Sequence, residues 1–251
     1  MADRTDYILE RLDEVGFLNV NDLADELDVS SATIRRDFSS LEEEGKLRRV
    51  AGGAIKLSDE ALETLDTDTD VGHKMTVNAE AKRRVCELAA SVVQDGDCVY
   101  IDGGSSSVYL FKLLQNRHIT IVTTNLLLSS HLELPVTASI IIVGGMYIAE
   151  HALTFNSTAY AQMQGYNFNH SFVTCAGADV ARGLAYCTEA ETRNLKQLVC
   201  RQSKHSHLLV DCSKLGKIGF CNLGRLDSFD TVFCDKPLDN EDYPTNFRFC
   251  V

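Results

Sequence analysis

The sequence predicts a small α+β domain followed by a larger α/β domain. In residues 1–57, three segments with apolar side chains at helical spacing precede two short apolar segments around a glycine-rich turn. From residue 75 to 251, short apolar strands alternate with helical segments, which is typical of a parallel sheet covered on both faces. Residues 58–74 contain six acidic side chains and little apolar periodicity, so they are predicted to link the two domains.

Composition limits the classes of function. The 251 residues carry a formal net charge of −12, which argues against a protein that coats nucleic acid or an anionic membrane but permits one local basic patch. No apolar run approaches the roughly 18 residues of a membrane span, and the N-terminus lacks the apolar core of a signal peptide. We therefore expect a cytoplasmic protein with no membrane partner.

Cysteines and histidines give no sign of a metal site. The nine cysteines include no C-x-x-C pair, so they are predicted to be buried thiols rather than a disulfide framework or a zinc ribbon. The seven histidines lack the paired helical spacing of metal ligands, and His205 and His207 are predicted to lie at the surface. No metal and no cofactor is expected.

The first domain begins with three predicted helices. Residues 3–15 form the first, and Asn21 is predicted to cap a short second helix. Ser30 or Ser31 is predicted to cap a third helix, which ends at Gly45.

Two strands then form a hairpin, residues 46–50 and 54–57, around the Ala51-Gly52-Gly53 turn. Three helices and a hairpin are the order of a winged helix-turn-helix, whose third helix enters the major groove of DNA. Residues 30–57 contain 6 basic and 4 acidic side chains, whereas residues 1–29 contain 2 and 9. The third helix and the hairpin are therefore positive relative to their surroundings.

These positions define the predicted DNA contacts. Because Ile34 and Phe38 must face the core, the other side of the third helix is exposed. The predicted contacts are Ser31, Ala32, Thr33, Arg35, Arg36, Lys46, Arg48 and Arg49, of which Lys46 is a weaker candidate, as is Lys56. The alternatives are that Arg35 and Arg36 solvate the helix and pair with Asp37 or Glu42, and that the hairpin arginines protect an edge strand.

The second domain contains alternating predicted elements. The helices are residues 78–94, 106–116, 126–133 and 188–202. The strands are residues 98–102, 119–125, 138–145, 170–175, 207–211 and 230–235. In a parallel sheet, ligands collect at the carboxyl ends of the strands.

Several of those strand ends have residues suited to an anion. The strand 98–102 runs into GGSSS, whose backbone N–H groups and hydroxyls at a helix start suit phosphate. TTN at 123–125, VGG at 143–145 and AGAD at 176–179 follow other strands, and Lys214 leaves the strand 207–211 as a candidate cation. The alternatives are a tight turn capped by serines and a lysine in a solvent-facing loop.

The sequence resembles the DeoR family of bacterial transcriptional regulators in both halves. The first half matches through DVSSATIRRD, LEEEGKL and GGA; the second has DGGSSS, TTN, paired glycines, G-x-D, E-A-E and D-x-S-K-x-G in the family's order. The resemblance implies a sensor domain with the fold of ribose-5-phosphate isomerase and the CoA transferases. It also implies a repressor of a carbohydrate-utilisation operon that is released from double-stranded operator DNA by a phosphorylated sugar or a related metabolite. Because helix-turn-helix proteins usually read paired half-sites, we expect a homo-oligomer.

Carried over by position, the resemblance implies an effector pocket. Its residues are Asp102, Gly104, Ser105, Ser106, Ser107, Thr124, Asn125, Gly144, Gly145, Gly177, Asp179, Glu189 and Lys214. The sequence departs from the family at Ala51, commonly histidine, and at Thr174, commonly glycine. Asn156 also replaces a common glycine, which asparagine can imitate in a left-handed backbone. Arg193 or Lys196 takes the place of a family lysine.

Two alternatives remain beside a regulator. The chain could be a sugar-phosphate isomerase with a DNA-binding head, in which Glu189 is the base. Against this, AGAD begins with alanine where the isomerases have aspartate, and ARGLAY lacks the lysine of their glycine loop. The chain could instead be a regulator whose pocket is vestigial. We expect no enzyme activity.

Overall fold

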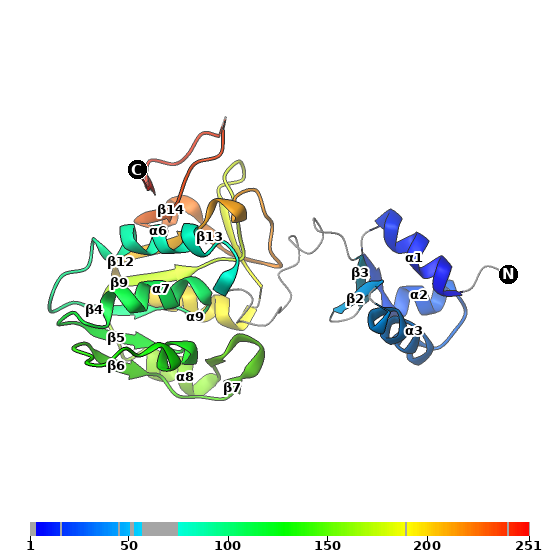
Figure 1. Cartoon of the computed structure of the whole chain (residues 1–251), viewed down its shortest axis with the longest axis horizontal. Helices are drawn as coiled ribbons and strands as arrows, with labels where there is room; N and C mark the ends of the chain where they lie inside the picture. The colour runs from blue at the N-terminus through cyan, green and yellow to red at the C-terminus, as the bar shows by residue number, and fades with distance from the viewer. Residues whose placement is uncertain are drawn as a thin grey trace. The chain divides into compact units, whose positions relative to one another are not determined.

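The computed structural model divides the chain into two compact units, Met1–Thr67 and Asp68–Val251 (Figure 1). The residues that it describes are 4–15, 17–44, 46–50, 53–56, 75–188, 190–239 and 241–250. The predicted linker 58–74 lies outside these ranges. In the described part of the chain, no helix is long and apolar enough to span a bilayer.

In the part of the first unit that the structure describes, three helices accompany a three-stranded antiparallel sheet of order β1-β3-β2 (Figure 1). The elements are α1 (Arg4–Val15), β1 (Phe17–Asn19), α2 (Val20–Glu26), α3 (Ser31–Glu43), β2 (Leu47–Val50) and β3 (Gly53–Lys56). The prediction missed β1, which is only three residues long and is defined by its pairing with β3. The predicted cap Asn21 is wrong, because α2 begins one residue earlier, at Val20. The predicted stop Gly45 lies outside the described residues.

The apolar stripes of these helices form one core. Ile8, Leu12, Leu23, Ile34, Phe38 and Leu41 are almost fully buried together with Leu47 of β2. This burial leaves the opposite side of α3 to solvent, as the spacing of Ile34 and Phe38 predicted.

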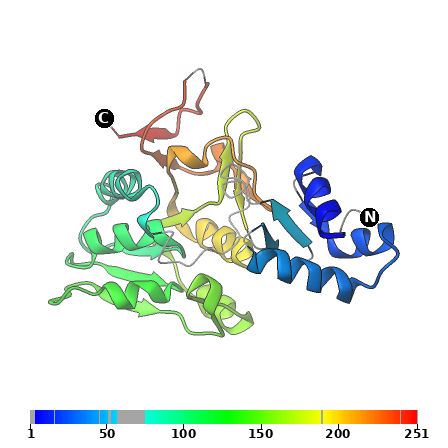
Figure 2. The ribbon, with the colours of Figure 1, turned by 45° about the vertical axis from the view of Figure 1, so that its right-hand side comes forward.

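The second unit is built on a seven-stranded parallel sheet of order β15-β14-β12-β9-β4-β5-β6 (Figures 1 and 2). Its strands are β4 (Cys98–Ile101), β5 (Thr120–Thr123), β6 (Ser139–Ile142), β9 (Phe168–Thr174), β12 (Ser203–Val210), β14 (Thr231–Cys234) and β15 (Phe247–Phe249). The prediction of a parallel α/β sheet is correct. The prediction missed only β15 of this sheet.

Helices cover both faces of this sheet. On one face, α6 (Ala79–Ala90) and α7 (Ser105–Leu114) pack against side chains such as Val99 and Ile121. On the other, α8 (Ser157–Met163) and α9 (Ala190–Arg201) pack against side chains such as Tyr100 and Val122. Consecutive strand residues face opposite sides, so each face has its own apolar core.

Two smaller sheets and several 3₁₀ turns were not predicted. The sheets are the antiparallel set β10 (Gly177–Asp179), β11 (Leu184–Cys187) and β13 (Cys221–Arg225), and the pair β7 (Tyr147–Ile148) and β8 (Leu153–Thr154). The turns are η1 (Leu126–His131), η2 (Ala149–His151), η3 (Cys212–Lys214) and η4 (Leu226–Ser228). The predicted α-helix 126–133 is wrong, because the segment between the cap Asn125 and the extended Leu132 is short and adopts the 3₁₀ form.

Candidate functional site

The N-terminus of α3 is fixed by a serine cap. The Ser30 Oγ accepts a hydrogen bond from the Thr33 backbone N–H at 3.2 Å, and it lies 2.9 Å from the Thr33 hydroxyl. Ser30 is therefore the cap, rather than Ser31. Ala32 is exposed, whereas Ser31 and Thr33 are half-buried. Of these three predicted DNA contacts, Ala32 is the most accessible.

The two arginines of α3 are exposed, and the neighbouring aspartate is occupied elsewhere. Asp37 accepts hydrogen bonds from Arg4 Nε at 2.5 Å and Nη2 at 2.9 Å, which joins α3 to α1. Among the described residues, Arg35 and Arg36 form no ion pair. The ion pair with Asp37, one part of the alternative interpretation, is therefore absent from the described residues, whereas the interpretation that the two arginines solvate the helix stays open.

Of the candidate DNA contacts in the hairpin, the structure describes the side chain of Lys46 but only the backbone of Arg48 and Arg49. Lys46 Nζ lies 2.7 Å from Glu44 Oε2, and the hydrogen bond to this carboxylate raises the Lys46 pKa. The charge of Lys46 is thus balanced locally. The backbones of Arg48 and Arg49 lie in β2, opposite Ile55 and Ala54 of β3, but their side chains are outside the described part.

In the second unit, the strand order changes direction between β4 and β9. From β4 the chain proceeds outward to β5 and β6, and it then returns to place β9, β12, β14 and β15 on the other side. Ligands of open α/β sheets bind outside the carboxyl ends of the strands at such a switch point. Asp102 directly follows β4, and Thr174 is the last residue of β9.

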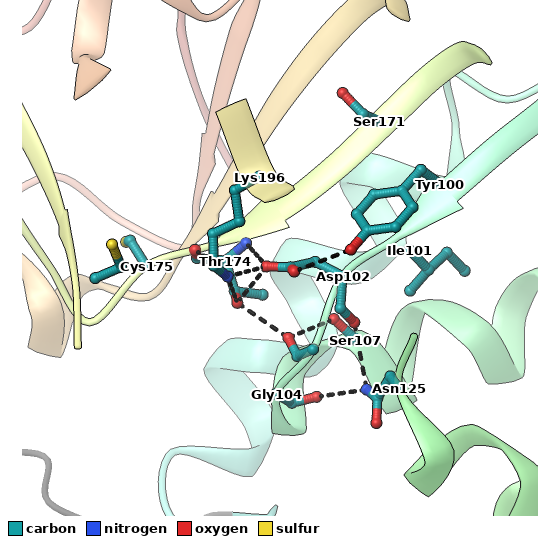
Figure 3. Close-up of polar contacts among 12 residues, drawn as sticks. Tyr100, Ile101, Asp102, Gly104, Ser107, Asn125, Ser171, Thr174, Cys175 and Lys196 are labelled. Carbon is teal, nitrogen blue, oxygen red and sulfur yellow. Dashed lines mark hydrogen bonds and ion pairs between the residues drawn. The ribbon is translucent and has the colours of Figure 1, made fainter. Parts of the chain in front are cut away.

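The buried Asp102 and Lys196 form one network with the half-buried Thr174 at this point (Figure 3). Asp102 Oδ2 accepts hydrogen bonds from the Thr174 N–H at 2.9 Å and hydroxyl at 3.0 Å, and it pairs with the Lys196 ammonium. Lys196 Nζ also donates to the Thr174 carbonyl at 3.1 Å. Lys196 therefore reaches Asp102, whereas Arg193 is half-buried and its Nε has no hydrogen-bond partner in the described part of the chain.

The serine loop, residues 103–107, is fixed by hydrogen bonds from buried side chains. Asn125 Nδ2 donates to the Asp102 and Gly104 carbonyls at 3.3 Å each, and Ser107 Oγ donates to the Gly103 carbonyl at 3.2 Å (Figure 3). Gly104 has φ of +97°, a conformation that favours glycine. Ser107 and Asn125 are buried and hold the loop, whereas the buried Thr124 accepts the Thr154 N–H at 2.9 Å through its carbonyl. Gly104, Ser105 and Ser106 form its accessible edge.

A buried lysine under this loop was missed by the sequence analysis. Lys82 of α6 is 5% exposed, and its Nζ donates to Ser105 Oγ at 3.0 Å. A signal was available, because Lys82 shares the buried stripe of its helix with Val85, Cys86 and Ala89. A lysine at a core position is seldom buried without a partner or a ligand.

Lys214 lies at the same edge of the sheet. It is the last residue of η3, just after β12, and its Nζ donates to the Cys175 carbonyl at 2.8 Å. Because β9 alone separates β12 from β4, about two strand spacings, or roughly 10 Å, separate their ends. Asn78 Nδ2 donates to Ser213 Oγ at 2.8 Å, which joins η3 to the start of α6. Two lysines and the serine loop thus meet at one edge.

Three of the predicted pocket residues, Gly177, Asp179 and Gly145, have structural contacts of their own. A Cβ on Gly177 would lie 2.3 Å from the Lys217 carbonyl oxygen, so glycine is required there by close packing. Asp179 accepts the Arg182 N–H at 2.9 Å in the turn after β10. Gly144 and Gly145 follow β6, and a Cβ on Gly145 would meet Asn156 and Ala159 within about 3.2 Å.

Asn156 caps a helix instead of imitating a glycine. Asn156 has φ of −173°, which is extended, so the expected left-handed conformation is wrong; its Oδ1 instead caps α8 by accepting the Ala159 N–H at 2.9 Å. Glu189 lies outside the described residues.

The chemistry available at this edge is anion binding. Burial raises the pKa of the Cys175 thiol to about 11, so this nearby thiol is protonated at neutral pH. No group of three or more His, Cys, Asp or Glu side chains in the described ranges is arranged to hold a metal ion. The remaining features are two ammonium groups, hydroxyls and the N-terminus of α7, all of which favour an anion.

Both units match known families. Residues 4–60 match the DeoR-like helix-turn-helix domain, and residues 77–236 match the DeoR C-terminal sensor domain. The chain is 30% identical to the transcriptional regulator FruR of Bacillus subtilis, over 87% of this chain and 84% of FruR. It is 28% identical to the L-fucose operon activator of Haemophilus influenzae, over 95% and 93% of the two chains.

Among solved structures, the chain is similar to ribose 5-phosphate isomerase A of Methanocaldococcus jannaschii. The identity is 15%, the TM-score is 0.41 and 56% of each chain is covered. The two domain matches account for both units of the structure. The chain therefore belongs to the DeoR family of DNA-binding transcriptional regulators, with an N-terminal helix-turn-helix domain and a C-terminal sensor domain.

Proposed function

We propose that this regulator is a cytoplasmic repressor of a carbohydrate-utilisation operon, released from its operator by a phosphorylated sugar or a related metabolite. The observation that carries the proposal is the edge where the serine loop, Lys82 and Lys214 meet. A dianionic phosphate fits this edge because it accepts several N–H and O–H hydrogen bonds and pairs with ammonium groups.

The geometry also suits the sugar part of such a ligand. About 10 Å between the ends of β4 and β12 is the scale of a phosphorylated monosaccharide. The half-buried Thr174 lies between these ends on β9. Lys82 donates to the accessible Ser105, which places a cation directly behind the loop and supports a working pocket over a vestigial one.

We further propose that the chain has no isomerase activity. Asp179, the carboxylate of the AGAD segment, accepts the Arg182 N–H in a surface turn. Asp102 Oδ2 is bonded to Thr174 and Lys196, so it is not poised to take a proton from a substrate. An assay of aldose–ketose isomerisation with each phosphorylated sugar that binds should show no turnover above buffer.

A screen of matched ligands tests the proposed effector. Phosphorylated sugars, each paired with its dephosphorylated form, are added to the full chain and unfolding is measured. A phosphorylated effector at about 100 times its Kd should raise the free energy of unfolding by roughly 2.7 kcal/mol, and its dephosphorylated form should have little effect. An equal response to both forms would contradict the phosphate assignment.

The direction of regulation needs a separate measurement. Operator DNA is first selected with the purified protein from genomic fragments, and the effector is then titrated into the complex. Release of the DNA, and higher transcription of the adjacent genes after deletion of the regulator, are expected for a repressor. Lower transcription after deletion would identify an activator, which is the role in the name of the Haemophilus influenzae relative.

A further inference from the structure

One long stretch of this chain is almost without charge. Of the 24 basic and 36 acidic side chains, residues 118–178 contain only Glu133 and Glu150. The stretch is a quarter of the chain, and the rest of the sequence carries charges at ordinary density. Its neutrality is therefore a local property.

In the structure, most of this stretch lies at one end of the parallel sheet. We define the neutral flank as residues 134–163, which include the edge strand β6, the pair β7 and β8, and helix α8. These elements lie together beside β5 in Figure 1. In the described part of the chain, β6 pairs with β5 on one side and with no strand on the other.

The flank exposes apolar side chains on both faces of its edge. Ile141 and Ile142 are 37% and 39% exposed, and Met146 and Tyr147 are 63% and 56% exposed. Consecutive strand residues point to opposite faces, so both faces at β6 are accessible. Sheet edges are ordinarily protected by lysines, prolines or bulges, and β6 has none of these.

The outer side of α8 continues this surface without charge. Ser157, Thr158, Ala161 and Gln162 are exposed there. A stable homodimer buries roughly 800 Å² of each partner, which is more than a four-residue edge strand offers. Met146, Tyr147 and the exposed side of α8 supply the additional area beside β6.

We propose that the neutral flank is the interface between two copies of this chain, with β6 pairing antiparallel to β6 of the second copy. Two molecules of net charge −12 repel each other, so they associate most readily where charge is absent. A charged partner, in contrast, gains no electrostatic attraction from this surface. Identical edges related by a twofold axis satisfy each other's unpaired backbone groups.

The inference deepens the proposed function without depending on the effector. A helix-turn-helix regulator that reads paired half-sites needs two copies held together. The flank supplies that association through the sensor domain, whether or not the ligand is a phosphorylated sugar.

The test uses the full chain and analytical ultracentrifugation over a wide range of concentrations. Ile141→Lys places a charge on the edge strand, and Met146→Lys does so at a more exposed position where folding is less affected. Leu238→Lys is the matched control, because Leu238 is 38% exposed and lies outside the flank. Thermal unfolding confirms that each variant is folded.

We expect the wild type and Leu238→Lys to associate equally, and both flank variants to dissociate about tenfold or more readily. A monomeric wild type, as would result if another segment of the chain covered the flank, would overturn the proposal. Unchanged association of both flank variants would overturn it as well. Loss of effector stabilisation in a wild type that still associates would contradict only the proposed function.

Discussion

Asp102 and Lys196 are a buried ion pair whose removal should be felt mainly as lost stability. Lys196→Met leaves the Asp102 carboxylate buried without its cation, so the free energy of unfolding in urea should fall by about 3–5 kcal/mol. Asp102→Asn combined with Lys196→Met should restore part of that loss, because no uncompensated charge remains. Lys112→Met, which breaks the exposed pair with Glu133, should cost about 1 kcal/mol or less. Equal losses for the two lysines would contradict this account.

His207 should make the stability depend on pH. The predicted surface position of His207 is wrong, because its side chain is only 3% exposed. Burial and the neighbouring His170 lower its pKa to about 3, and Asp230 has a smaller opposing effect. The unfolded chain binds this proton below about pH 6.5. The folded chain binds it only near pH 3, so stability should fall as the pH falls between these values, by up to about 1.4 kcal/mol per pH unit.

The check compares wild type and His207→Phe in urea at several pH values between about 7 and 5. Phenylalanine preserves the ring contacts with Phe172 and Phe233 but cannot titrate. Carboxylates contribute equally to both proteins, so the difference between the two slopes reports His207. Parallel curves would show that His207 is not the source.

At the scale of an element, α3 should determine which DNA sequence is bound. Arg35→Ala and Arg36→Ala remove exposed side chains, so stability should change little. Loss of a bidentate base contact should weaken operator binding by about 1–3 kcal/mol, roughly a 5- to 150-fold rise in Kd. Fluorescence anisotropy of labelled operator DNA measures the Kd of both variants, and Arg225→Ala, at an exposed position of the sensor domain, is the control. Operator affinity that is unchanged in both α3 variants would contradict this role.

The β2–β3 hairpin should instead contribute affinity without sequence preference. Arg48→Ala and Arg49→Ala, both in β2, are expected to weaken binding to operator and to unrelated duplexes alike. Each should also reduce the slope of log Kd against log salt by about 1, because one fewer counterion is released per lost phosphate contact. An effect confined to one base pair of the operator would show that the arginine reads a base.

At the scale of the whole molecule, effector response and DNA binding should be separable. Lys214→Ala removes a cation and Ser106→Asp adds a negative charge at the accessible edge of the loop, so each should abolish stabilisation by the phosphorylated effector. DNA affinity should be unchanged, since the DNA-binding residues belong to the other unit. The resulting repressor would remain on its operator when the effector is present. Ser228→Asp, exposed elsewhere on the same domain, should respond as wild type. A normal response by Ser106→Asp would refute the phosphate site.

Local patterns predicted most of the elements. The stripe of Ile34, Phe38 and Leu41 and the cap Ser30 predicted α3, because helices depend on contacts three or four residues apart. Apolar strands between helices predicted the parallel sheet, because strands covered by helices on both faces are apolar along their whole length. The sheet of β10, β11 and β13 was not predictable in this way, because β11 and β13 are short and far apart in the chain.

The sequence by itself determined the class of each domain, the positions of six strands of the parallel sheet, and the position of the serine loop and the arginines of α3. These depend on residue type and on spacing along the chain. Only the tertiary structure decided which charges meet, because Lys82 and Ser105 are 23 residues apart and Lys196 and Asp102 are 94 apart. It also decided that His207 is buried and that β6 is the edge of the sheet. Burial and pairing depend on where distant strands pack, which is fixed by the summed contacts of the whole domain.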